Sequence, residues 1–398
     1  MNPSLRCSAL IVGAGIVGCC TAYRLAQQGV GDVVIIDKAD AASGPTGRSS
    51  GIIRQFYTDP TLVQMARQGL HEYAASLKTF GHDAGFVRTG WLLTVDARSE
   101  PIARKGLDVQ RPLGVPSRWL SVDEMRALVP EIAVGDLVGG IYEDDSGYGD
   151  PPGAATAFLS AARELGVSYH PHTAVARFVR RGDRIAGVET ANGTIVEAEL
   201  IFNCAGSWVP QLLAPLGYAT PVSTSRHQIV TLRERPRPKR PIVSDPVNLV
   251  YIRPEGNDLT LIGSNDPADS LDHVDVERCP EYAEDAKIET MVTNASRRLP
   301  QLEHAGIAHD WSGVYDVSTD GFPILGKLPG LDGMVIATGL SGHGFKLAPA
   351  IAEILSSYLS ATVDPRAHLF RWTRFEEGEP IRSTTTSSLT TMAAAGTQ

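Results

Sequence analysis

Apolar residues occur along the chain in two arrangements, short continuous runs and longer segments with helical spacing. The first run, Ala9–Val12, is too short for a helix and enters a turn with glycines at positions 13, 15 and 18. A helix of small residues follows to Gln28, and a second apolar run ends in Asp37. This order of strand, glycine turn, helix, strand and acid predicts a dinucleotide-binding unit.

Each glycine of this turn has a physical task. Gly13 permits the tight turn, Gly15 lets the backbone approach a pyrophosphate, and Gly18 lets the helix pack closely on the strand. The helix N-terminus faces the phosphates, where its free N–H groups and positive dipole end favour negative charge. Asp37 follows at the spacing of a carboxylate that accepts hydrogen bonds from the adenosine ribose. The turn therefore predicts a bound adenine dinucleotide.

The remaining pattern predicts further strands and helices, with antiparallel strands in the second half of the chain. Helices are predicted at Leu62–Phe80, Val122–Leu128, Gly153–Leu165, Tyr282–Leu299 and from Lys346 to Tyr358. Strands are predicted at Phe86–Val95, Val167–Ala176, Arg184–Thr190, Gly193–Glu197, Leu200–Asn203, Arg226–Leu232, Asn248–Ile252, Leu259–Ser264 and Met334–Thr338. The strands from Arg226 to Ser264 suit an antiparallel sheet in a second domain.

Composition narrows the class of protein. The 398 residues are 43% hydrophobic and 20% charged, which suits a globular chain of about two domains. The net charge of −9 disfavours binding to nucleic acid, which needs clustered Lys and Arg. The most apolar long region, Leu200–Val222, is broken by two prolines, so no transmembrane segment is predicted.

The cysteines and histidines indicate no metal site. Five cysteines without a Cys-x-x-Cys pair favour neither a disulfide framework nor zinc, and they fit a reducing cytoplasm. His170 and His172 share a strand face, but no carboxylate or cysteine completes a ligand set, so a structural or surface role is favoured. A lipoprotein signal ending at Cys19 is disfavoured because glycines interrupt its apolar segment.

Two later stretches carry candidate chemistry. Residues 39–51 form a loop of small and hydroxylated residues that can lie against a ligand, and this loop leads into the cation Arg54. Residues 339–346 read Gly-Leu-Ser-Gly-His-Gly-Phe-Lys and precede a helix, so their backbone can approach an electron-rich ring. Ser341 lacks the Gly-x-Ser-x-Gly spacing of a hydrolase. A surface ion pair is the alternative interpretation of Arg54.

Together, these motifs resemble the flavin-dependent D-amino-acid oxidase superfamily. They are the glycine turn, the loop Gly44–Arg54, the pattern Tyr315-x-x-x-Thr-Asp-Gly-x-Pro323 and the stretch Gly339–Lys346. The closest resemblance is to sarcosine oxidases, especially β-subunit-like members, and it covers nearly the whole chain.

The resemblance implies an α/β fold in which a doubly wound, Rossmann-like FAD-binding domain carries an inserted α+β substrate domain on a mixed, largely antiparallel sheet. We expect residues 1–85, 146–222 and 306–375 to form the FAD-binding domain. Residues 86–145 and 223–305 are expected to form the substrate domain. Residues 376–398, rich in Ser, Thr and Ala, are predicted to be a disordered tail.

The resemblance also implies roles for single residues. Arg54 and Lys346 are expected to hold a substrate carboxylate over the flavin, with Tyr315 and His343 nearby, as the catalytic group. The expected FAD contacts are Gly13, Gly15, Ile16, Val17, Gly18, Asp37, Lys38, Gly47, Arg48, Ser49, Ser50, Gly51, Val175, Ala205, Gly206, Trp208, Gly313, Gly342, Gly344, Phe345 and Lys346. The alternatives are packing roles for His343 and Tyr315 and a solvent-facing Lys346.

Three departures from the family pattern qualify the expected chemistry. Gly313 stands where monomeric sarcosine oxidases carry a flavin-linking cysteine, and residues 43–50 hold no His or Cys, so non-covalent FAD is predicted. Leu261 replaces the lysine that activates oxygen, which leaves O2 or another electron acceptor open. Asn265 replaces a histidine of the substrate pocket, so sarcosine need not be the substrate.

The resulting prediction is an FAD-dependent oxidoreductase that oxidises a small amino acid, preferably N-substituted, by hydride transfer to flavin N5. The product is an imine that hydrolyses. One alternative is a D-amino-acid or 2-hydroxy-acid dehydrogenase of the same fold, and another is a flavin-carrying subunit of a larger amine oxidoreductase. A homo- or hetero-oligomer is compatible with each of these interpretations.

Overall fold

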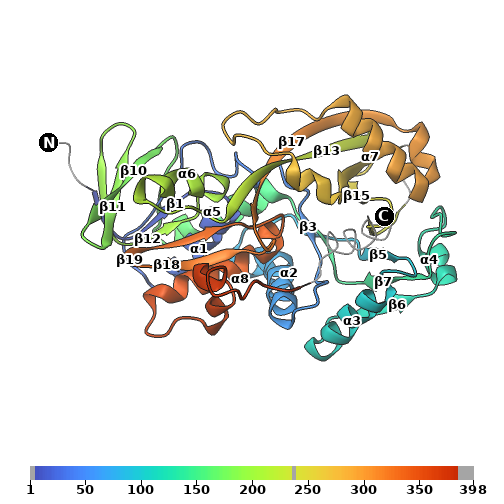
Figure 1. Ribbon diagram of the computed structural model, residues 1–398, viewed down its shortest axis with the longest axis horizontal. Coiled ribbons are helices and arrows are strands. Elements are labelled where there is room, and N and C mark those ends of the chain that lie inside the picture. The colour runs from blue at the N-terminus through green and yellow to red at the C-terminus, as the bar shows by residue number, and fades with distance from the viewer. Residues whose placement is uncertain (1–4, 235–238, 384–398) are drawn as a thin grey trace.

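The computed structural model describes residues 5–234 and 239–383, which form two parts placed side by side along the long axis of the molecule (Figure 1). Each part is built on an eight-stranded sheet. A small third sheet contains β3 (Ile52–Ile53), β8 (Gly147–Tyr148) and β4 (Val87–Arg88), and β3 leads directly into Arg54.

The first sheet has a parallel centre. Its order is β10 (Val175–Arg181), β11 (Arg184–Thr190), β19 (Leu331–Thr338), β12 (Ile195–Asn203), β1 (Leu5–Val12), β2 (Val33–Ile36) and β9 (Ser168–His170), with β18 (Ile324–Leu328) beside β19. The strands β19, β12, β1, β2 and β9 pair in parallel, and β10, β11 and β18 add antiparallel pairs. Parallel strands expose their carboxyl ends at one edge, which is where ligands bind in such sheets.

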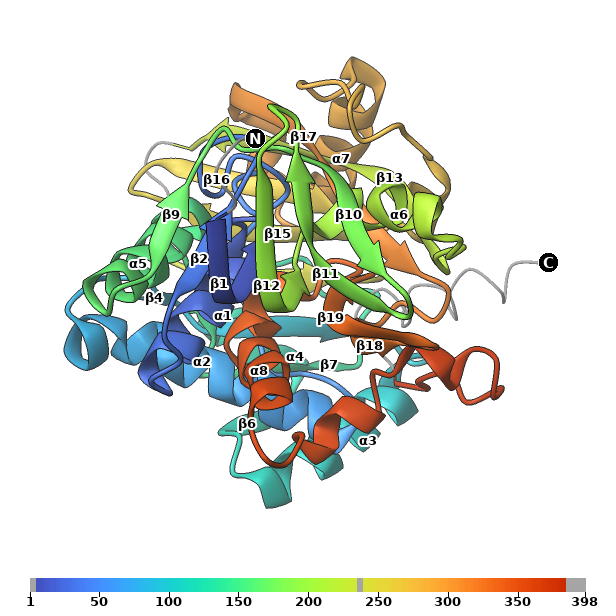
Figure 2. The same cartoon turned by 90° about the vertical axis from the view of Figure 1, so that its left-hand side faces the viewer.

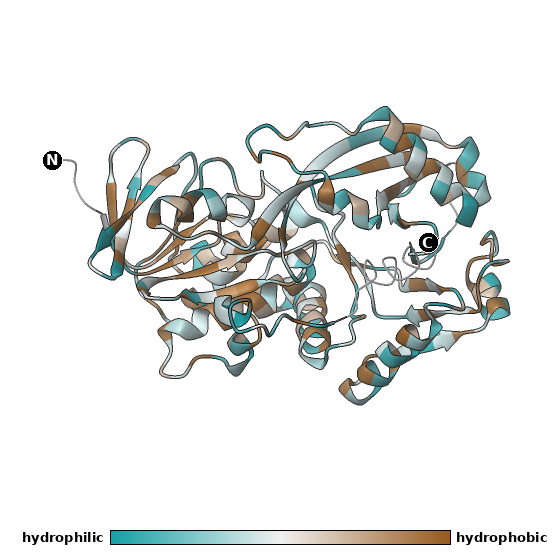
Figure 3. Cartoon of the chain, in the orientation of Figure 1, coloured by the Kyte–Doolittle hydropathy of each residue, from teal (hydrophilic) through white to brown (hydrophobic). Residues whose placement is uncertain are grey.

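Helices cover both faces of this sheet (Figure 2). One face packs against α1 (Ile16–Gln27), α2 (Pro60–Phe80), α5 (Pro151–Glu164) and α8 (Gly344–Ser356), and the other against α6 (Val209–Leu213). Figure 3 shows apolar residues concentrated on the central strands and on the inward sides of the helices. The helix α8 is apolar on nearly every side and almost wholly buried, so it fixes the residues at its start.

The second sheet is mixed and mainly antiparallel. Its order is β17 (Gly306–Ser318), β13 (Val222–Arg233), β16 (Leu259–Ser264), β15 (Val250–Glu255), β14 (Ile242–Asp245), β5 (Trp91–Val95), β7 (Gly139–Glu143) and β6 (Ser117–Leu120). Only β14 and β5 pair in parallel among these strands of the described chain. The helices α3 (Glu100–Gln110), α4 (Val122–Leu128) and α7 (Asp285–Arg298) accompany it. The predicted fold class is therefore confirmed.

Single 3-10 turns connect several of these elements. They lie at Arg111–Leu113, Gly206–Trp208, Ala214–Leu216, Pro267–Leu271, Pro300–His304, Ser357–Leu359, Pro365–His368 and Trp372–Arg374. None of the helices within the described ranges is long and apolar enough to cross a membrane.

Four predicted strands are divided or merged in the structure. The segment Val167–Ala176 is divided into β9 and β10, because His172 takes a left-handed φ of +53° between them. The segment Phe86–Val95 is divided at Gly90, whose φ is +76°. The segments Gly193–Glu197 and Leu200–Asn203 are instead parts of one strand, β12, because Ile195–Asn203 continues the pairing with β1.

Two predicted domain limits also differ from the structure. Residues 306–318 were assigned to the FAD-binding domain, but β17 pairs with β13 from Val222 and Ser318 to Arg233 and Gly306, so it belongs to the second sheet. The predicted disordered tail begins too early, since Ile381 is buried and its N–H donates to Asp320. Residues 384–398 of that predicted tail lie outside the described residues.

Candidate active site

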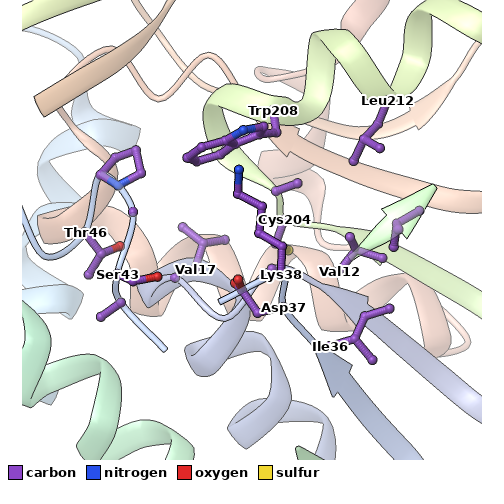
Figure 4. A pocket seen from close by; sticks show the side chains of 18 of the residues that line it. Val12, Val17, Ile36, Asp37, Lys38, Ser43, Thr46, Cys204, Trp208 and Leu212 are labelled. Carbon is purple, nitrogen blue, oxygen red and sulfur yellow. The ribbon is translucent and has the colours of Figure 1, made fainter. Parts of the chain in front are cut away.

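A cavity of about 320 Å³ opens at the carboxyl ends of β1, β2 and β12, beside the start of α1 (Figure 4). The predicted FAD contacts that line this cavity are Gly13, Gly15, Ile16, Val17, Asp37, Lys38, Val175, Ala205, Gly206 and Trp208. Ser43, Thr46, Cys204, Leu212, Glu277 and Asp316 also line it and were not predicted as contacts. The glycine turn, Asp37 and the chain directly after β12 therefore line one cavity.

The glycines of this cavity fit a dinucleotide. Gly13 has a φ of +105°, and a Cβ there would lie 2.5 Å from the carbonyl oxygen of Cys204. A Cβ on Gly18 would lie 1.9 Å from the carbonyl oxygen of Gly13, so only glycine lets α1 pack this closely. Gly15 lines the cavity as the N-cap of α1 and has no capping side chain of its own, while the Ile16 N–H donates to Thr46 Oγ1 at 3.1 Å. The positive end of the α1 dipole therefore lies at the cavity, where it favours a phosphate.

The acid at the end of β2 is fixed by the backbone around it. Asp37 accepts hydrogen bonds from the N–H of Ala14 at 2.6 Å and from the N–H of Ala39 at 2.9 Å. Each carboxylate oxygen has further acceptor capacity, and the residue lines the cavity. This arrangement suits acceptance of ribose hydroxyls.

Lys38 and Trp208 meet above the same cavity. The ammonium of Lys38 lies 4.1 Å from the centroid of a Trp208 ring, and Figure 4 shows the lysine side chain directed toward the indole. Glu277 accepts from the Lys38 ammonium at 2.7 Å and from the Trp208 indole N–H at 2.6 Å. Glu277 follows β16, so this carboxylate ties the second part of the molecule to the cavity wall.

Six predicted FAD contacts line neither this cavity nor the second one described below. They are Gly18, Gly47, Arg48, Gly51, Gly313 and Gly344. Close packing accounts for most of these glycines: a Cβ would lie 2.4 Å from the Ala42 carbonyl oxygen at Gly47 and 3.0 Å from the Arg48 Cβ at Gly313. Arg48 donates to the carbonyl of Ser312 at 3.1 Å, so it joins the loop to β17.

A second cavity, of about 200 Å³, adjoins the first. Three chain segments contribute to both: the loop of residues 43–52, residues 315–317 of β17, and residues 340–341 before α8. The predicted residues that line the second cavity are Ser49, Ser50, Arg54, Tyr315, Gly342, His343, Phe345 and Lys346. All four predicted catalytic residues are thus brought together, next to the dinucleotide cavity.

Arg54 is held in a buried segment after β3. The residue is 5% exposed, and its guanidinium donates to the Phe56 carbonyl and lies 5.7 Å from the Trp91 ring centroid. The buried Glu143 fixes the same segment by accepting from the Gln55 N–H at 2.8 Å. Burial raises the pKa of Glu143, while its three hydrogen-bond donors and the charge of Arg54 oppose that rise.

Lys346 and His343 lie at the start of α8. Lys346 is 6% exposed and its ammonium contacts the Gly342 carbonyl oxygen at 3.3 Å. Burial, and then the charge of Arg54, lower the pKa of Lys346 well below its usual range. His343 Nδ1 lies 2.9 Å from Tyr57 Oη, and burial, followed by the neighbouring basic groups of Lys346 and Arg54, lowers its pKa well below the usual value. His343 is therefore a neutral imidazole.

An aromatic wall completes the second cavity. Tyr315 stacks on His227 with ring centroids 3.7 Å apart, and burial raises the Tyr315 pKa far above its usual value. Burial also lowers the pKa of His227 to about 3, so this ring is neutral. Tyr251 lies beside Gly263, where a Cβ would meet its ring.

Sequence reasoning missed His227, Tyr251, Trp91 and Glu143. They lie on four strands separated by long stretches of chain, and none of them belongs to a short motif. A signal in the sequence was present only for Glu143, an acid within an otherwise apolar strand.

Asn265 and Leu261, two of the positions where this chain departs from the family pattern, lie in different surroundings. Asn265 lines the second cavity, and its side-chain amide donates to the Val250 carbonyl at 3.1 Å. Leu261 is fully buried in β16 and lines neither cavity. Within the described residues, no group of three or more His, Cys, Asp or Glu side chains is arranged to hold a metal ion.

Comparison with known proteins gives consistent relatives. The chain is 27% identical to 4-methylaminobutanoate oxidase (formaldehyde-forming) of Paenarthrobacter nicotinovorans, over 88% of this chain and 43% of that protein. It is 25% identical to sarcosine oxidase subunit beta of Rhodobacter capsulatus, over 96% of this chain and 91% of that subunit. The chain thus spans less than half the length of the first relative and most of the second.

Among solved structures, L-proline dehydrogenase from P. horikoshii superposes with a TM-score of 0.87 at 25% identity, covering 95% of this chain and all of that one. The family of FAD-dependent oxidoreductases called DAO matches residues 8–358. These matches confirm the resemblance inferred from the sequence and the expectation of FAD. The chain belongs to the DAO family of FAD-dependent oxidoreductases.

Proposed function

We propose that this protein oxidises a small amino acid, preferably one with a secondary amine, at the carbon next to nitrogen. The observation that carries the proposal is the pair of buried cations, Arg54 and Lys346, in a cavity of about 200 Å³ that adjoins the dinucleotide cavity. Two buried cations in a cavity of this size suit one carboxylate. The names of relatives that act on sarcosine and 4-methylaminobutanoate support the amine class.

The residues of the second cavity would orient the substrate. Arg54 can bind both carboxylate oxygens with its planar guanidinium, and Lys346 adds a second charge at the start of α8. FAD, when bound, accepts the two electrons and the hydrogen that leave the substrate carbon. The neutral His343 and the aromatic wall of Tyr315 and His227 limit the space available to water around the reacting carbon.

Non-covalent attachment of FAD belongs to the same proposal. Gly313 cannot form a bond to the flavin, and residues 43–50 contain neither His nor Cys. Leu261 is apolar and buried, and it stands where the oxidases that this chain resembles carry the lysine that activates oxygen. Because Leu261 supplies no such charge, we propose O2 or another compound as the electron acceptor, to be distinguished by readmitting air.

The proposal is tested by titrating the purified protein without oxygen against N-methyl, cyclic, D- and L-amino acids and 2-hydroxy acids. Loss of the visible flavin absorbance with an N-substituted amino acid supports the proposal, and readmitted air then separates oxidase from dehydrogenase. Bleaching by 2-hydroxy acids alone would contradict it. Bleaching by no compound would favour a flavin-carrying subunit, an alternative to which the similarity to a sarcosine oxidase β subunit gives weight.

A further inference from the structure

The ammonium position of Lys346 is poorly suited to a permanent charge. The residue is 6% exposed, and among the described residues the one polar contact of its ammonium is the carbonyl oxygen of Gly342 at 3.3 Å. Within residues 5–234 and 239–383, no carboxylate lies at ion-pair distance from its Nζ. A buried ammonium with a single distant acceptor is costly, because neither water nor an anion replaces its hydration.

The titratable groups packed around Lys346 add no compensating charge. Those that line the same cavity are Arg54, His343, Tyr315, His227, Tyr251 and Asp266, and within the described residues no ion pair joins Asp266 to the Lys346 ammonium. Tyr57 contacts His343, and Tyr73 and Glu72 belong to α2, which packs against the Lys346 backbone at Gly69. Both oxygens of Glu72 accept from Arg24, so that carboxylate is already neutralised. Glu143 interacts with Arg54 and fixes the backbone beside it.

The two cations of the cavity therefore differ. Arg54 keeps its charge at any accessible pH and has Glu143 nearby, whereas Lys346 has a repelling cation as its neighbour. Burial and the Arg54 charge lower the pKa of Lys346 well below its usual range, which favours a neutral amine near neutral pH.

A free amino acid presents the complementary problem. Near neutral pH its amine is protonated, and a protonated nitrogen has no lone pair to assist the departure of hydrogen from the neighbouring carbon. A base within the cavity must remove this proton before oxidation. His343 is the weaker candidate, because an imidazole starts from a pKa of about 6.5 and a lysine from about 10.4.

We propose that Lys346 meets the substrate as a neutral amine, accepts the proton of the substrate ammonium at Nζ, and then holds the substrate carboxylate as an ammonium ion. This inference rests on the proposed function. One N–H bond of the substrate breaks and one Nζ–H bond forms, and no electrons are exchanged. Because one carbon separates the amine from the carboxylate, a group at the carboxylate is also within reach of the amine, directly or through one water.

The same step explains how two buried cations tolerate one another. Before binding, the cavity is lined by Arg54, which has Glu143 beside it, and by the carboxylate of Asp266, and Lys346 adds no charge. After binding, the carboxylate arrives together with the new ammonium, so each added charge has a partner. Lys346 is thus assigned two successive tasks, as base and then as carboxylate ligand.

The first test is the number of protons taken up when acetate binds to the FAD-loaded protein. Acetate has no proton to give, so Lys346 must take about one proton from solvent per acetate bound near pH 7.5. Calorimetry in phosphate and in Tris, which differ in ionisation enthalpy, measures this number. Lys346→Arg, a permanent cation, is expected to bind acetate with no uptake, and Lys346→Met to bind it weakly with none.

The second test uses the best amine substrate under anaerobic conditions. For the wild-type protein, the second-order rate constant of flavin bleaching is expected to be flat between about pH 7 and pH 9, because the zwitterion is the form that binds. In Lys346→Arg it should rise about tenfold per pH unit, following the scarce neutral amine.

The outcomes separate the two claims. Saturable acetate binding to the wild-type protein without proton uptake would overturn the role of Lys346 as a base while the carboxylate site stands. A wild-type rate constant that rises tenfold per pH unit would do the same. Absence of acetate binding would contradict both the base and the carboxylate site of the proposed function.

Discussion

The carboxylate of Glu277 allows a test of whether contacts between the two parts of the molecule slow the release of FAD from the first cavity. It accepts from Lys38 at 2.7 Å and from the Trp208 indole at 2.6 Å, and both partners line the cavity. Glu277 lies in the second part of the chain, whereas Lys38 and Trp208 belong to the first. Replacing Glu277 with Ala therefore removes a bridge between the parts without touching the glycine turn.

The magnitude follows from the two contacts that are lost. The Lys38 ammonium and Glu277 are 40% and 55% exposed, so their ion pair contributes about 0.2–1 kcal/mol. The indole hydrogen bond to a charged acceptor adds about 1.5 kcal/mol, the lower end of its range, because the site is open to water. A loss of about 2 kcal/mol corresponds to roughly 30-fold faster cavity opening. Glu277→Gln keeps an acceptor for Trp208 and should accelerate opening only about 2- to 5-fold.

The assay is the rate of FAD release, followed by the rise in free flavin fluorescence after dilution of the loaded protein. Glu281→Ala is the matched control, since Glu281 lies in the same loop. Its carboxylate lies 3.8 Å from the Arg48 guanidinium, and neither residue lines the cavity. High salt should reduce the difference in FAD release rate between wild type and Glu277→Gln, because it screens the exposed ion pair of Lys38 and Glu277. Equal release rates for wild type and Glu277→Ala would refute the bridge.

Three further predictions concern the framework and the cofactor. Gly18→Ala should lower FAD occupancy and reduce the free energy of unfolding by about 1–3 kcal/mol, because its Cβ would lie 1.9 Å from the Gly13 carbonyl oxygen. The flavin-to-protein absorbance ratio measures the occupancy, and thermal unfolding measures the stability. Arg374→Met should cost about 3–5 kcal/mol at pH 7, because Arg374 is fully buried and binds both oxygens of Asp320 at 2.8 Å. Burial would raise the pKa of Asp320, but Arg374 holds it below its usual value, so the pair stabilises the protein above about pH 4 and this stabilisation fades at lower pH. In denaturant unfolding at several pH values, the difference in the free energy of unfolding between wild type and Arg374→Met should therefore decrease on acidification. A constant difference would count against a stabilising Arg374–Asp320 pair. Acid precipitation should leave a colourless pellet and free FAD, whereas a yellow pellet would show a covalent flavin.

The glycine turn and the start of α8 were predictable because their signals are local. Gly13 and Gly18 are required by contacts with residues a few positions away or on an adjacent strand, so spacing alone reveals them. The same holds for Lys346, which a short glycine-rich stretch places at a helix start.

The aromatic wall and the support of Arg54 were not predictable in this way. His227 meets Tyr315 only because β13 and β17 pair in one register, in which Ser225 faces Tyr315 and His227 faces Gly313. That pairing joins segments about 90 positions apart, and the alternation pattern of each strand is compatible with several partners. The assignment of β17 to the wrong domain has the same cause, since pattern identifies a strand but not its neighbour.

The most direct test of the central claim compares one amine substrate with its methyl ester in anaerobic bleaching of the flavin. The account predicts that the acid bleaches the wild-type protein with saturation and that the ester, which has lost its negative charge, binds at least about 100-fold more weakly. Arg54→Met should reduce this preference, since Lys346 is then the only one of the two carboxylate ligands that remains. Equal saturation by acid and ester would contradict a carboxylate site at Arg54 and Lys346.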